Sequence, residues 1–263
     1  VRPGAYLLLV VGVSAAEVER LVPADAVARR RVLVVRSWRL AAEPGEETLF
    51  TTLRVWQEQL DAGELTVEPG PAVINRLARA GLWAVAQREW AALTAASGHP
   101  DPAYASGENL VWNGDLERPV FGGELDWVLP ETESYRAAID PRGGREGSRA
   151  LRLEIDGKVP GGLQRVEQRQ PVEAAGAYEL AAWQRAEGFT SAPAPRLEVW
   201  PAGSRRPLAA LEAPPADGEW HEARARFEIS DTRSPIVIRW VDTVQVGVEG
   251  TGWVDSIVLG PAD

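Results

Sequence analysis

The chemistry open to this chain of 263 residues is limited first by the residues that it lacks. It has no cysteine and only two histidines, His99 and His221, which lie far apart in the sequence. Thiol nucleophiles, disulfides and zinc sites built on thiolates are therefore excluded, and a serine triad or a two-histidine metal site would have to recruit one or both histidines. A G-x-S-x-G elbow, a phosphate-binding loop and a dinucleotide fingerprint are also absent from the sequence. The sequence thus points away from the common catalytic constellations.

Acidic residues outnumber basic residues, and the excess lies in the second part of the chain. The net charge is −10, from 28 basic and 38 acidic residues. Residues 1–105 hold 11 basic and 12 acidic residues, whereas residues 106–263 hold 17 and 26. A phosphate backbone would be repelled by this second part, so nucleic acid is disfavoured as a partner.

The start of the chain bears on where the protein acts. The apolar segment 6–13 is too short to span a bilayer and lacks the basic region and cleavage site of a signal peptide. Because the chain begins at Val1 and not at Met, we interpret it as a fragment or a processed form, which leaves room for an export signal before it. Together with the lack of cysteine, this favours a protein of the bacterial periplasm, the cell surface or the secreted fraction.

Apolar residues recur at helical spacing up to about residue 98, and this pattern predicts five helices. Gly63, Gly81 and Gly98 suit helix ends. The predicted helices span 4–21, 24–42, 45–62, 70–80 and 83–96. The buried face of the third helix is predicted to hold Leu49, Leu53, Trp56 and Leu60.

The last two predicted helices have the spacing of a helical hairpin. Gly81 stands at the turn, and the small Ala86 is followed four residues later by Trp90. Trp56 precedes Trp90 by 34 residues, although a shift of 33 aligns other apolar pairs equally well. This pattern resembles the tetratricopeptide repeat, which implies stacked hairpins that dock a protein partner. The alternative is a plain helical bundle with aromatic core residues.

From about residue 108, apolar and polar residues alternate between glycine- and proline-rich turns. Each strand then has one apolar and one polar face, as two packed antiparallel sheets require. The predicted strands span 109–113, 125–129, 134–140, 149–155, 162–172, 176–187, 195–201, 206–212, 219–229, 235–242 and 251–259. We therefore predict a multi-domain α plus all-β fold, with a helical domain at 1–98, a linker at 99–107 and an antiparallel β-sandwich at 108–263.

A succession of short motifs runs through the second domain, over about residues 108–260. In chain order they are Asn113-Gly-Asp-Leu-Glu117, Trp127, Gly147–Leu153, Gln168 before Pro171, Gly176–Leu180, Trp220 before Phe227, and Gly252–Leu259. This order resembles that of the calcium-containing jelly-roll carbohydrate-binding modules appended to bacterial glycanases, which are galactose-binding-like domains. The resemblance implies a jelly roll that binds a glycan or another extracellular ligand.

The resemblance also implies a metal. Where these modules hold a structural calcium, its oxygen ligands join the first strand to the last. By motif position, Glu117 and Asp255 would supply carboxylates here and Asp115 a further one, with carbonyl oxygens near residues 145–147 completing the set. The alternative is that Glu117 and Asp255 hydrogen-bond backbone amides or pair with Arg149.

Glycan binding in such modules uses aromatic rings, on which sugar C–H faces stack, and polar side chains that bond the hydroxyl groups. Trp183 is the large aromatic residue on an otherwise polar strand face, so it is the candidate stacking platform. Packing under a loop or against the helical domain is the alternative for it. The full set of candidate ligand-binding residues is Trp183, Arg185, Arg152, Arg224, Arg226 and Arg239.

Arginines and tryptophans on these strands could also serve the fold itself. Arg224 and Arg226 lie between Glu222 and Glu228, so cross-strand ion pairs account for them without a ligand. If they do face a ligand, an acidic glycan would suit them. Tryptophans in apolar strands are predicted to lie in the core, namely Trp112, Trp220, Trp240 and Trp253.

One segment suggests catalysis. Glu124-Leu-Asp126-Trp-Val resembles the start of the catalytic strand of retaining endoglucanases, which place two carboxylates about 5 Å apart. Val128 and Leu129 stand where the closing glutamate would be, so hydrolysis by this route is not predicted.

The sequence therefore predicts a non-catalytic bacterial envelope or secreted protein. Its sandwich would bind a glycan or another extracellular ligand, and its helical repeats would dock a protein partner. A structural subunit of a larger surface complex or filament, without sugar affinity, is the alternative hypothesis. A glycan-cleaving enzyme is the third.

Overall fold

The computed structural model describes residues 46–65, 70–131, 135–156, 166–189, 193–241 and 249–262. The chain divides into two compact units, residues 1–98 and residues 99–263. The predicted helices at 4–21 and 24–42 lie outside the described residues. Among the helices that the structure describes, none combines the length and the apolar character that crossing a membrane requires.

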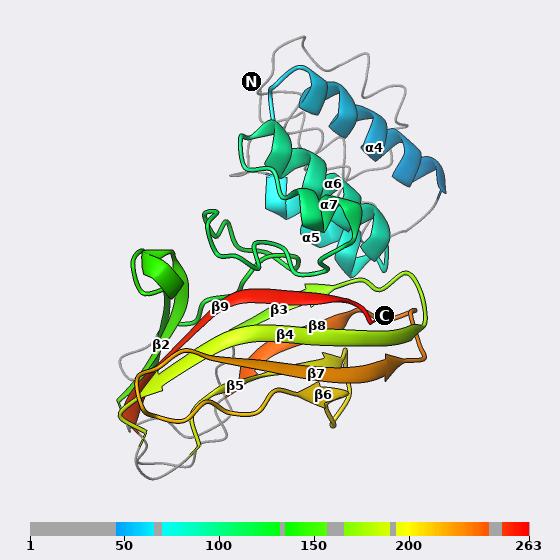
Figure 1. Ribbon diagram of the computed structural model, residues 1–263. Helices are drawn as coiled ribbons and strands as arrows, with labels where there is room; N and C mark the ends of the chain where they lie inside the picture. The colour runs from blue at the N-terminus through cyan, green and yellow to red at the C-terminus, as the bar shows by residue number, and fades with distance from the viewer. Residues whose placement is uncertain are drawn as a thin grey trace. The chain divides into compact units, whose positions relative to one another are not determined.

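Helices form the described part of the first unit (Figure 1): α4 (Glu46–Asp61), α5 (Gly70–Arg79) and α6 (Trp83–Ala96). Their ends agree with the predicted ranges to within one residue. α5 and α6 form a hairpin because Gly81 adopts a φ of 82°, which ends α5 and lets the Leu82 amide bond the Leu77 carbonyl at 2.9 Å. Their buried side chains are Val73, Ile74, Leu77, Ala78, Ala86, Trp90 and Leu93.

The predicted apolar face of α4 is partly correct. Trp56 and Leu60 are buried, whereas Leu53 is only half-buried, and the side chain of Leu49 lies outside the described residues. The hairpin of α5 and α6 agrees both with a tetratricopeptide-like repeat and with a plain bundle. Repeat stacking and partner docking therefore stay predictions.

The second unit is an antiparallel β-sandwich, as predicted (Figure 1). A five-stranded sheet has the order β1-β2-β9-β4-β7, and a four-stranded sheet has the order β3-β8-β5-β6. The strands are β1 (Tyr135–Asp140), β2 (Ala150–Asp156), β3 (Val166–Gln170), β4 (Gly176–Glu187), β5 (Arg196–Pro201), β6 (Ala209–Ala210), β7 (His221–Ile229), β8 (Ile236–Val241) and β9 (Glu249–Pro261). The core between the sheets includes Leu151, Leu153, Leu180, Leu197, Val199, Ile238, Trp240, Val254, Ile257 and Leu259.

A β-bulge changes the alternation of side chains along β9. The register between β4 and β9 shifts between Ala181 and Trp183, and Ser256 adopts a left-handed φ of 53°. As a result, both Val254 and Ile257 point into the core although they are three residues apart. The outer face of β9 therefore holds Trp253 before the bulge and the exposed Val258 after it.

Residues 99–107, predicted to be a linker, belong to the second unit. They include the short helix α7 (Pro102–Ser106), in which Asp101 accepts a hydrogen bond from the Tyr104 amide at 3.2 Å. Pro102 does not prevent this helix, because the amides of a first turn need no helical partner. Tyr104 is buried and its hydroxyl bonds Gln170 of β3 at 3.1 Å, so the segment packs on the sandwich.

The predicted strand at 109–113 is not a strand. The Leu110 amide bonds the Leu259 carbonyl of β9 at 2.7 Å, but the amides of the next three residues bond side chains. The Trp112 amide donates to Gln168 Oε1, and Gln168 Nε2 donates to the Trp112 carbonyl, both at 3.0 Å. Asn113 then turns the chain with a φ of 51°. The predicted strand at 125–129 is reduced to a bridge between Val128 and Glu167, and the one at 206–212 to β6.

Candidate functional site

Alternation along the strands brings most of the candidate residues to one surface, the outer face of the five-stranded sheet. On β4, Leu180, Ala182 and Gln184 point inward and are buried. Their neighbours on β4 therefore point outward. With the outward residues of β2, β7 and β9, they form a surface that includes Arg152, Glu179, Ala181, Trp183, Arg185, Glu222, Arg224, Arg226, Trp253, Ser256 and Val258.

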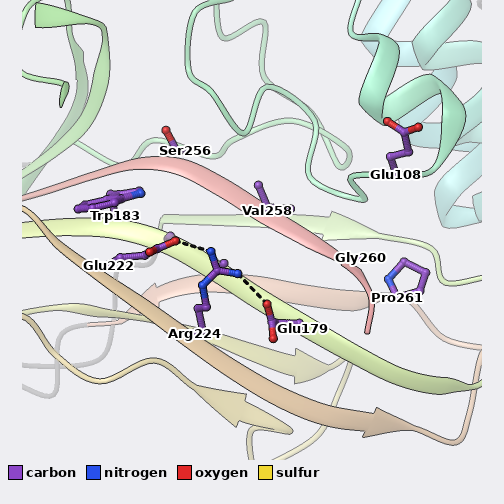
Figure 2. A pocket seen from close by; sticks show the side chains of 11 residues that line it. Glu108, Glu179, Trp183, Glu222, Arg224, Ser256, Val258, Gly260 and Pro261 are labelled. Carbon is purple, nitrogen blue, oxygen red and sulfur yellow. Dashed lines mark hydrogen bonds and ion pairs between the residues drawn. The ribbon is translucent and has the colours of Figure 1, made fainter. Parts of the chain in front are cut away.

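A groove of about 340 Å³ runs over this outer face. Three of the residues that line it, Ala181, Ser256 and Gly260, have small side chains or none. Figure 2 shows Trp183 toward one end of the groove and Pro261 toward the other, with the charged residues of β4 and β7 along one side. The groove is lined by Glu108, Glu179, Ala181, Ala182, Trp183, Glu222, Arg224, Ser256, Val258, Gly260 and Pro261.

Ion pairs fix the charged side of the groove. Arg224 lies 3.0 Å from a carboxylate oxygen of Glu179 and 2.6 Å from one of Glu222, and Arg226 bonds the other oxygen of Glu179 at 2.9 Å (Figure 2 shows the first two). The hydrogen bonds from Arg226 and Arg224 hold the pKa of Glu179 below its ordinary value. These contacts confirm the predicted cross-strand ion pairs of Arg224 and Arg226. The paired side chains still offer acceptors and donors to a ligand, because each is partly exposed.

Trp183 is half-buried, and an arginine covers one face of its ring. The guanidinium carbon of Arg145 lies 3.7 Å from the ring centroid. The short turn η1 (Arg145–Gly147) places this arginine, because Asp255 of β9 accepts hydrogen bonds from the Arg145 amide and the Ser148 hydroxyl, both at 3.1 Å. The predicted stacking platform thus consists of the Trp183 indole together with the Arg145 guanidinium that covers one face of it.

A second arginine–tryptophan cluster lies next to Trp183 on the same face. Arg185 is directly opposite Trp253 in the register of β4 and β9, and its guanidinium carbon lies 3.9 Å from that ring. Trp220 stands 5.3 Å from the same guanidinium, and Arg152 lies 5.7 Å from the Trp253 ring. Trp253 Nε1 donates to Asp140 at 3.1 Å.

Asp140, which anchors the Trp253 ring, is ionised. Desolvation acts to raise the pKa of its carboxyl, but hydrogen bonds from the Arg142 amide and Trp253 Nε1, with Arg152 nearby, together hold that pKa below its ordinary value. The Asp140 carboxylate is thus stabilised by the Arg142 amide, Trp253 Nε1 and the nearby Arg152.

Five of the six candidate ligand-binding residues share the outer face, and one does not. Arg239 lies on β8, in the other sheet, where it bonds Glu167 at 3.0 Å and stands over Trp200. The core prediction for tryptophans also needs correction. Trp112, Trp240 and Trp253 are buried, but the Trp253 ring lies under Arg185 on the outer face and not in the core between the sheets, and Trp220 is only half-buried on that face.

The predicted calcium ligands are engaged in hydrogen bonds and ion pairs. Glu117 accepts from the Arg149 amide at 2.9 Å, Asp255 holds the turn at Arg145, and Asp115 lies 2.6 Å from the guanidinium of Arg118. In the described part of the chain, no three acidic or histidine side chains gather in a way that could hold a metal ion. This arrangement is the hydrogen-bonded alternative that the sequence left open. Calcium binding stays a prediction.

The two carboxylates that suggested hydrolysis have structural partners. Glu124 pairs with Arg169. Asp126 is buried and accepts hydrogen bonds from the amides of Phe121, Gly122 and Trp127 at 2.6–2.9 Å. These bonds favour the ionised form, but desolvation by burial is the larger effect and raises the pKa of Asp126 to about 6. Through these three hydrogen bonds, the Asp126 carboxylate holds the loop at 121–127 in place.

Comparisons with known proteins find only solved structures whose folds are similar to that of this chain. No protein-family model matches the chain, and no curated protein does. Among solved structures, a structure titled "CBM4 structure and function" is 14% identical with a TM-score of 0.41, covering 58% of this chain and 99% of its own. A CBM61 domain in complex with beta-1,4-galactotriose is 16% identical with a TM-score of 0.39, covering 59% and 99%. The CBM22-1 xylan-binding domain of Paenibacillus barcinonensis Xyn10C is 10% identical with a TM-score of 0.36, covering 57% and 94%. Such low identities and TM-scores carry no information on what this chain binds.

Sequence reasoning missed the residues that complete the outer face. Arg145 lies in a turn, where no periodicity shows which side chain it will meet. Trp253 and Trp220 were assigned to the core because their neighbours are apolar. The signal that could have found Trp253 is its register opposite Arg185, which depends on the position of the bulge in β9.

Proposed function

We propose that the second unit is a non-catalytic glycan-binding module and that the saccharide lies in the groove on the outer face of the five-stranded sheet. The observation that supports this most is the groove itself, which is lined in part by small residues and has a fixed charged side and an indole at one end. Its volume of about 340 Å³ lies at the lower end of the range of small-molecule sites. A surface groove suits a chain molecule that continues beyond it.

The lining chemistry fits a saccharide better than an apolar ligand. Glu179 and Glu222 can accept hydrogen bonds from sugar hydroxyls, and Arg224 can donate to their oxygens. Val258, which is 46% exposed, and the indole of Trp183 offer apolar contacts to C–H faces. Because the ion pairs already hold the charged side chains in place, binding would immobilise few of them.

Affinity electrophoresis in gels that contain soluble polysaccharides tests the proposal. We expect at least one polysaccharide to retard the intact chain, and Trp183→Ala to abolish the retardation. Trp200→Ala is the matched control, since Trp200 is also a half-buried tryptophan covered by an arginine, but on the other sheet. Ala181→Gln is a second variant, which fills the floor of the groove and leaves the Trp183 cluster intact.

Each outcome of this experiment is informative. Retardation lost in Trp183→Ala and in Ala181→Gln but kept in Trp200→Ala supports binding in the groove. No retardation by any polysaccharide, or an equal loss in Trp200→Ala, contradicts it. Thermal unfolding of each variant distinguishes a lost contact from a lost fold.

The remaining parts of the proposal follow from glycan binding. A module that meets polysaccharides would act in the periplasm, at the cell surface or after secretion, and the helical unit would dock a protein partner there. The alternative is an assembly block without sugar affinity. Native mass spectrometry that finds stable oligomers, together with no retardation in any gel, would favour that block.

A further inference from the structure

Arginines in the second unit are mostly tied to carboxylates, and two on the outer face are not. Ion pairs engage nine arginines in the described part of this unit: Arg118, Arg136, Arg152, Arg169, Arg196, Arg224, Arg226, Arg233 and Arg239. Arg145 and Arg185 form no ion pair with any described carboxylate, and both stack on tryptophan rings instead. Both are half-buried. These two side chains therefore have no acidic partner among the described residues.

Stacking on the tryptophan rings holds these two guanidinium groups in an orientation in which they can bind an anion. A guanidinium that lies flat on an indole directs its N–H groups sideways, in the plane of the fork, where they can meet a carboxylate with two parallel hydrogen bonds. Nε of Arg185 is buried without an acceptor in the described residues, so its terminal nitrogens are the donors left for a ligand. The two tryptophans thus act as supports that hold the arginines in place.

The two stacks lie beside each other and beside the groove. Trp183 and Arg185 alternate on β4, so their side chains leave the same face about 7 Å apart along the strand. Trp183 belongs both to the stack with Arg145 and to the lining of the groove. A chain molecule that occupies the groove and continues past Trp183 would therefore reach Arg145 and then Arg185.

Carboxylates near the two stacks are occupied by other groups. Asp255 accepts from the Arg145 amide and the Ser148 hydroxyl, and Asp140 accepts from Trp253 Nε1. Arg152, the third arginine of the cluster, pairs with Glu154. None of these acids bonds the guanidinium of Arg145 or Arg185 among the described residues.

The net charge of the unit makes general anion binding unfavourable. Residues 106–263 hold 17 basic and 26 acidic residues, so their overall field repels anions. At physiological ionic strength this field is screened over about 8 Å, and contacts within hydrogen-bond distance decide the affinity. An anion bound here would therefore be recognised by the two stacks and not by long-range attraction.

We propose that the glycan bound by this module is acidic, and that Arg145 and Arg185 bind carboxylate groups of its uronic acid residues. This inference rests on the proposed glycan-binding function and names the class of its ligand. A planar carboxylate matches the fork of a stacked guanidinium, whereas a neutral sugar would leave both charges unpaired.

The test compares acidic polysaccharides with chemically matched neutral ones. Polygalacturonate, alginate, hyaluronan and glucuronoxylan are each used as such and after reduction of their carboxyl groups to alcohols, which keeps the linkages unchanged. We expect at least one acidic polymer to bind the intact chain about tenfold more tightly, or more, than its reduced form, as the loss of charge-assisted hydrogen bonds predicts. Dextran sulfate and poly-glutamate are included to distinguish sulfate esters and acidic peptides from uronic acids.

Variants locate the effect at the two stacks. Arg185→Gln and Arg145→Gln are each expected to lower affinity for the acidic polymer about tenfold or more, with little effect on binding of the reduced polymer. Arg185→Lys keeps the charge but not the fork, and is expected to restore only part of the affinity. Arg233→Gln is the control, because it removes the same charge from an exposed ion pair in the turn between β7 and β8, beyond the other end of β4.

The outcomes separate this inference from the proposed function. Equal binding of an acidic polymer and its reduced form, lost in Trp183→Ala, would overturn the inference and leave the glycan-binding proposal in place. Equally strong binding of dextran sulfate or poly-glutamate would also overturn it, because the site would then not select uronic acids. An equal loss in Arg233→Gln would do the same. Absence of binding to every polysaccharide would refute both proposals.

Discussion

The buried carboxylate of Asp126 predicts a pH dependence of stability that can be measured directly. Asp126 is 1% exposed, and burial raises its pKa to about 6 in the folded chain, despite three hydrogen bonds from backbone amides. In the unfolded chain its pKa is about 3.9. Because the folded pKa is the higher one, the folded state takes up the proton first. The free energy of unfolding therefore gains from this group as the pH falls from about 6 to about 4, and loses that gain as the pH rises through 6.

The size of the effect follows from the two pKa values. Relative to pH 7.5, protonation of Asp126 adds about 1 kcal/mol to the free energy of unfolding at pH 5 and about 2 kcal/mol at pH 4. Other acidic groups titrate in the same range, so the wild-type curve alone does not isolate Asp126. Asp126→Asn does not titrate, and the difference between the wild-type chain and this variant contains the Asp126 contribution.

Urea unfolding followed by tryptophan fluorescence gives this difference at pH 7.5, 6, 5 and 4. We expect the stability of the wild type relative to Asp126→Asn to increase by about 2 kcal/mol between pH 7.5 and pH 4. The helical unit is common to both proteins, so its own titration cancels in the difference. A constant difference across this range, or one that increases with pH, would show that the carboxylate of Asp126 is not desolvated in the folded chain.

Three further predictions concern the sandwich. Ser256 adopts a φ of 53°, so Ser256→Gly should change the free energy of unfolding by less than about 1 kcal/mol, whereas the β-branched Ser256→Val should cost about 2 kcal/mol or more; equal effects in thermal unfolding would argue against the left-handed bulge. Gln168 is 1% exposed and bonds both backbone groups of Trp112, so Gln168→Ala should cost about 2–4 kcal/mol in urea unfolding, and a cost below about 1 kcal/mol would contradict its bridging role. The predicted calcium site, with Glu117 and Asp255 as ligands, should raise the Tm of the chelator-treated chain by several degrees in millimolar calcium, and Glu117→Gln should remove this rise; an unchanged Tm would favour the alternative in which both carboxylates only accept backbone amides.

Regular periodicity made much of the fold predictable. The helices α4, α5 and α6 have apolar residues at helical spacing and glycine after their ends. The strands β2, β4 and β7 alternate because one face packs in the core. The predicted ranges of these elements agree closely with the structure. The candidate residues on β4 and β7 were placed on the correct face for the same reason.

Elements that depend on distant partners could not be predicted. The segment at 109–113 looks like a strand, but it bonds the backbone of β9 only at Leu110, and from Val111 on its amides bond side chains, among them that of Gln168. Asp101 and Pro102 looked like part of a linker, yet they start a helix that packs through Tyr104. Arg145 joined the site only because Asp255, 110 residues further along, holds its turn.

The bulge at Ser256 has a consequence for the outer face of the five-stranded sheet. It divides β9 into two stretches whose inward and outward positions are out of phase, with Val254 and Ile257 both inward. Substitutions at outward positions such as Val258 can therefore reshape the outer face while the interior stays as it is. If the same residues alternated without the bulge, Ile257 and Leu259 would turn toward water and Val258 would face the core, so the left-handed conformation of Ser256 decides which side chains reach the outer face.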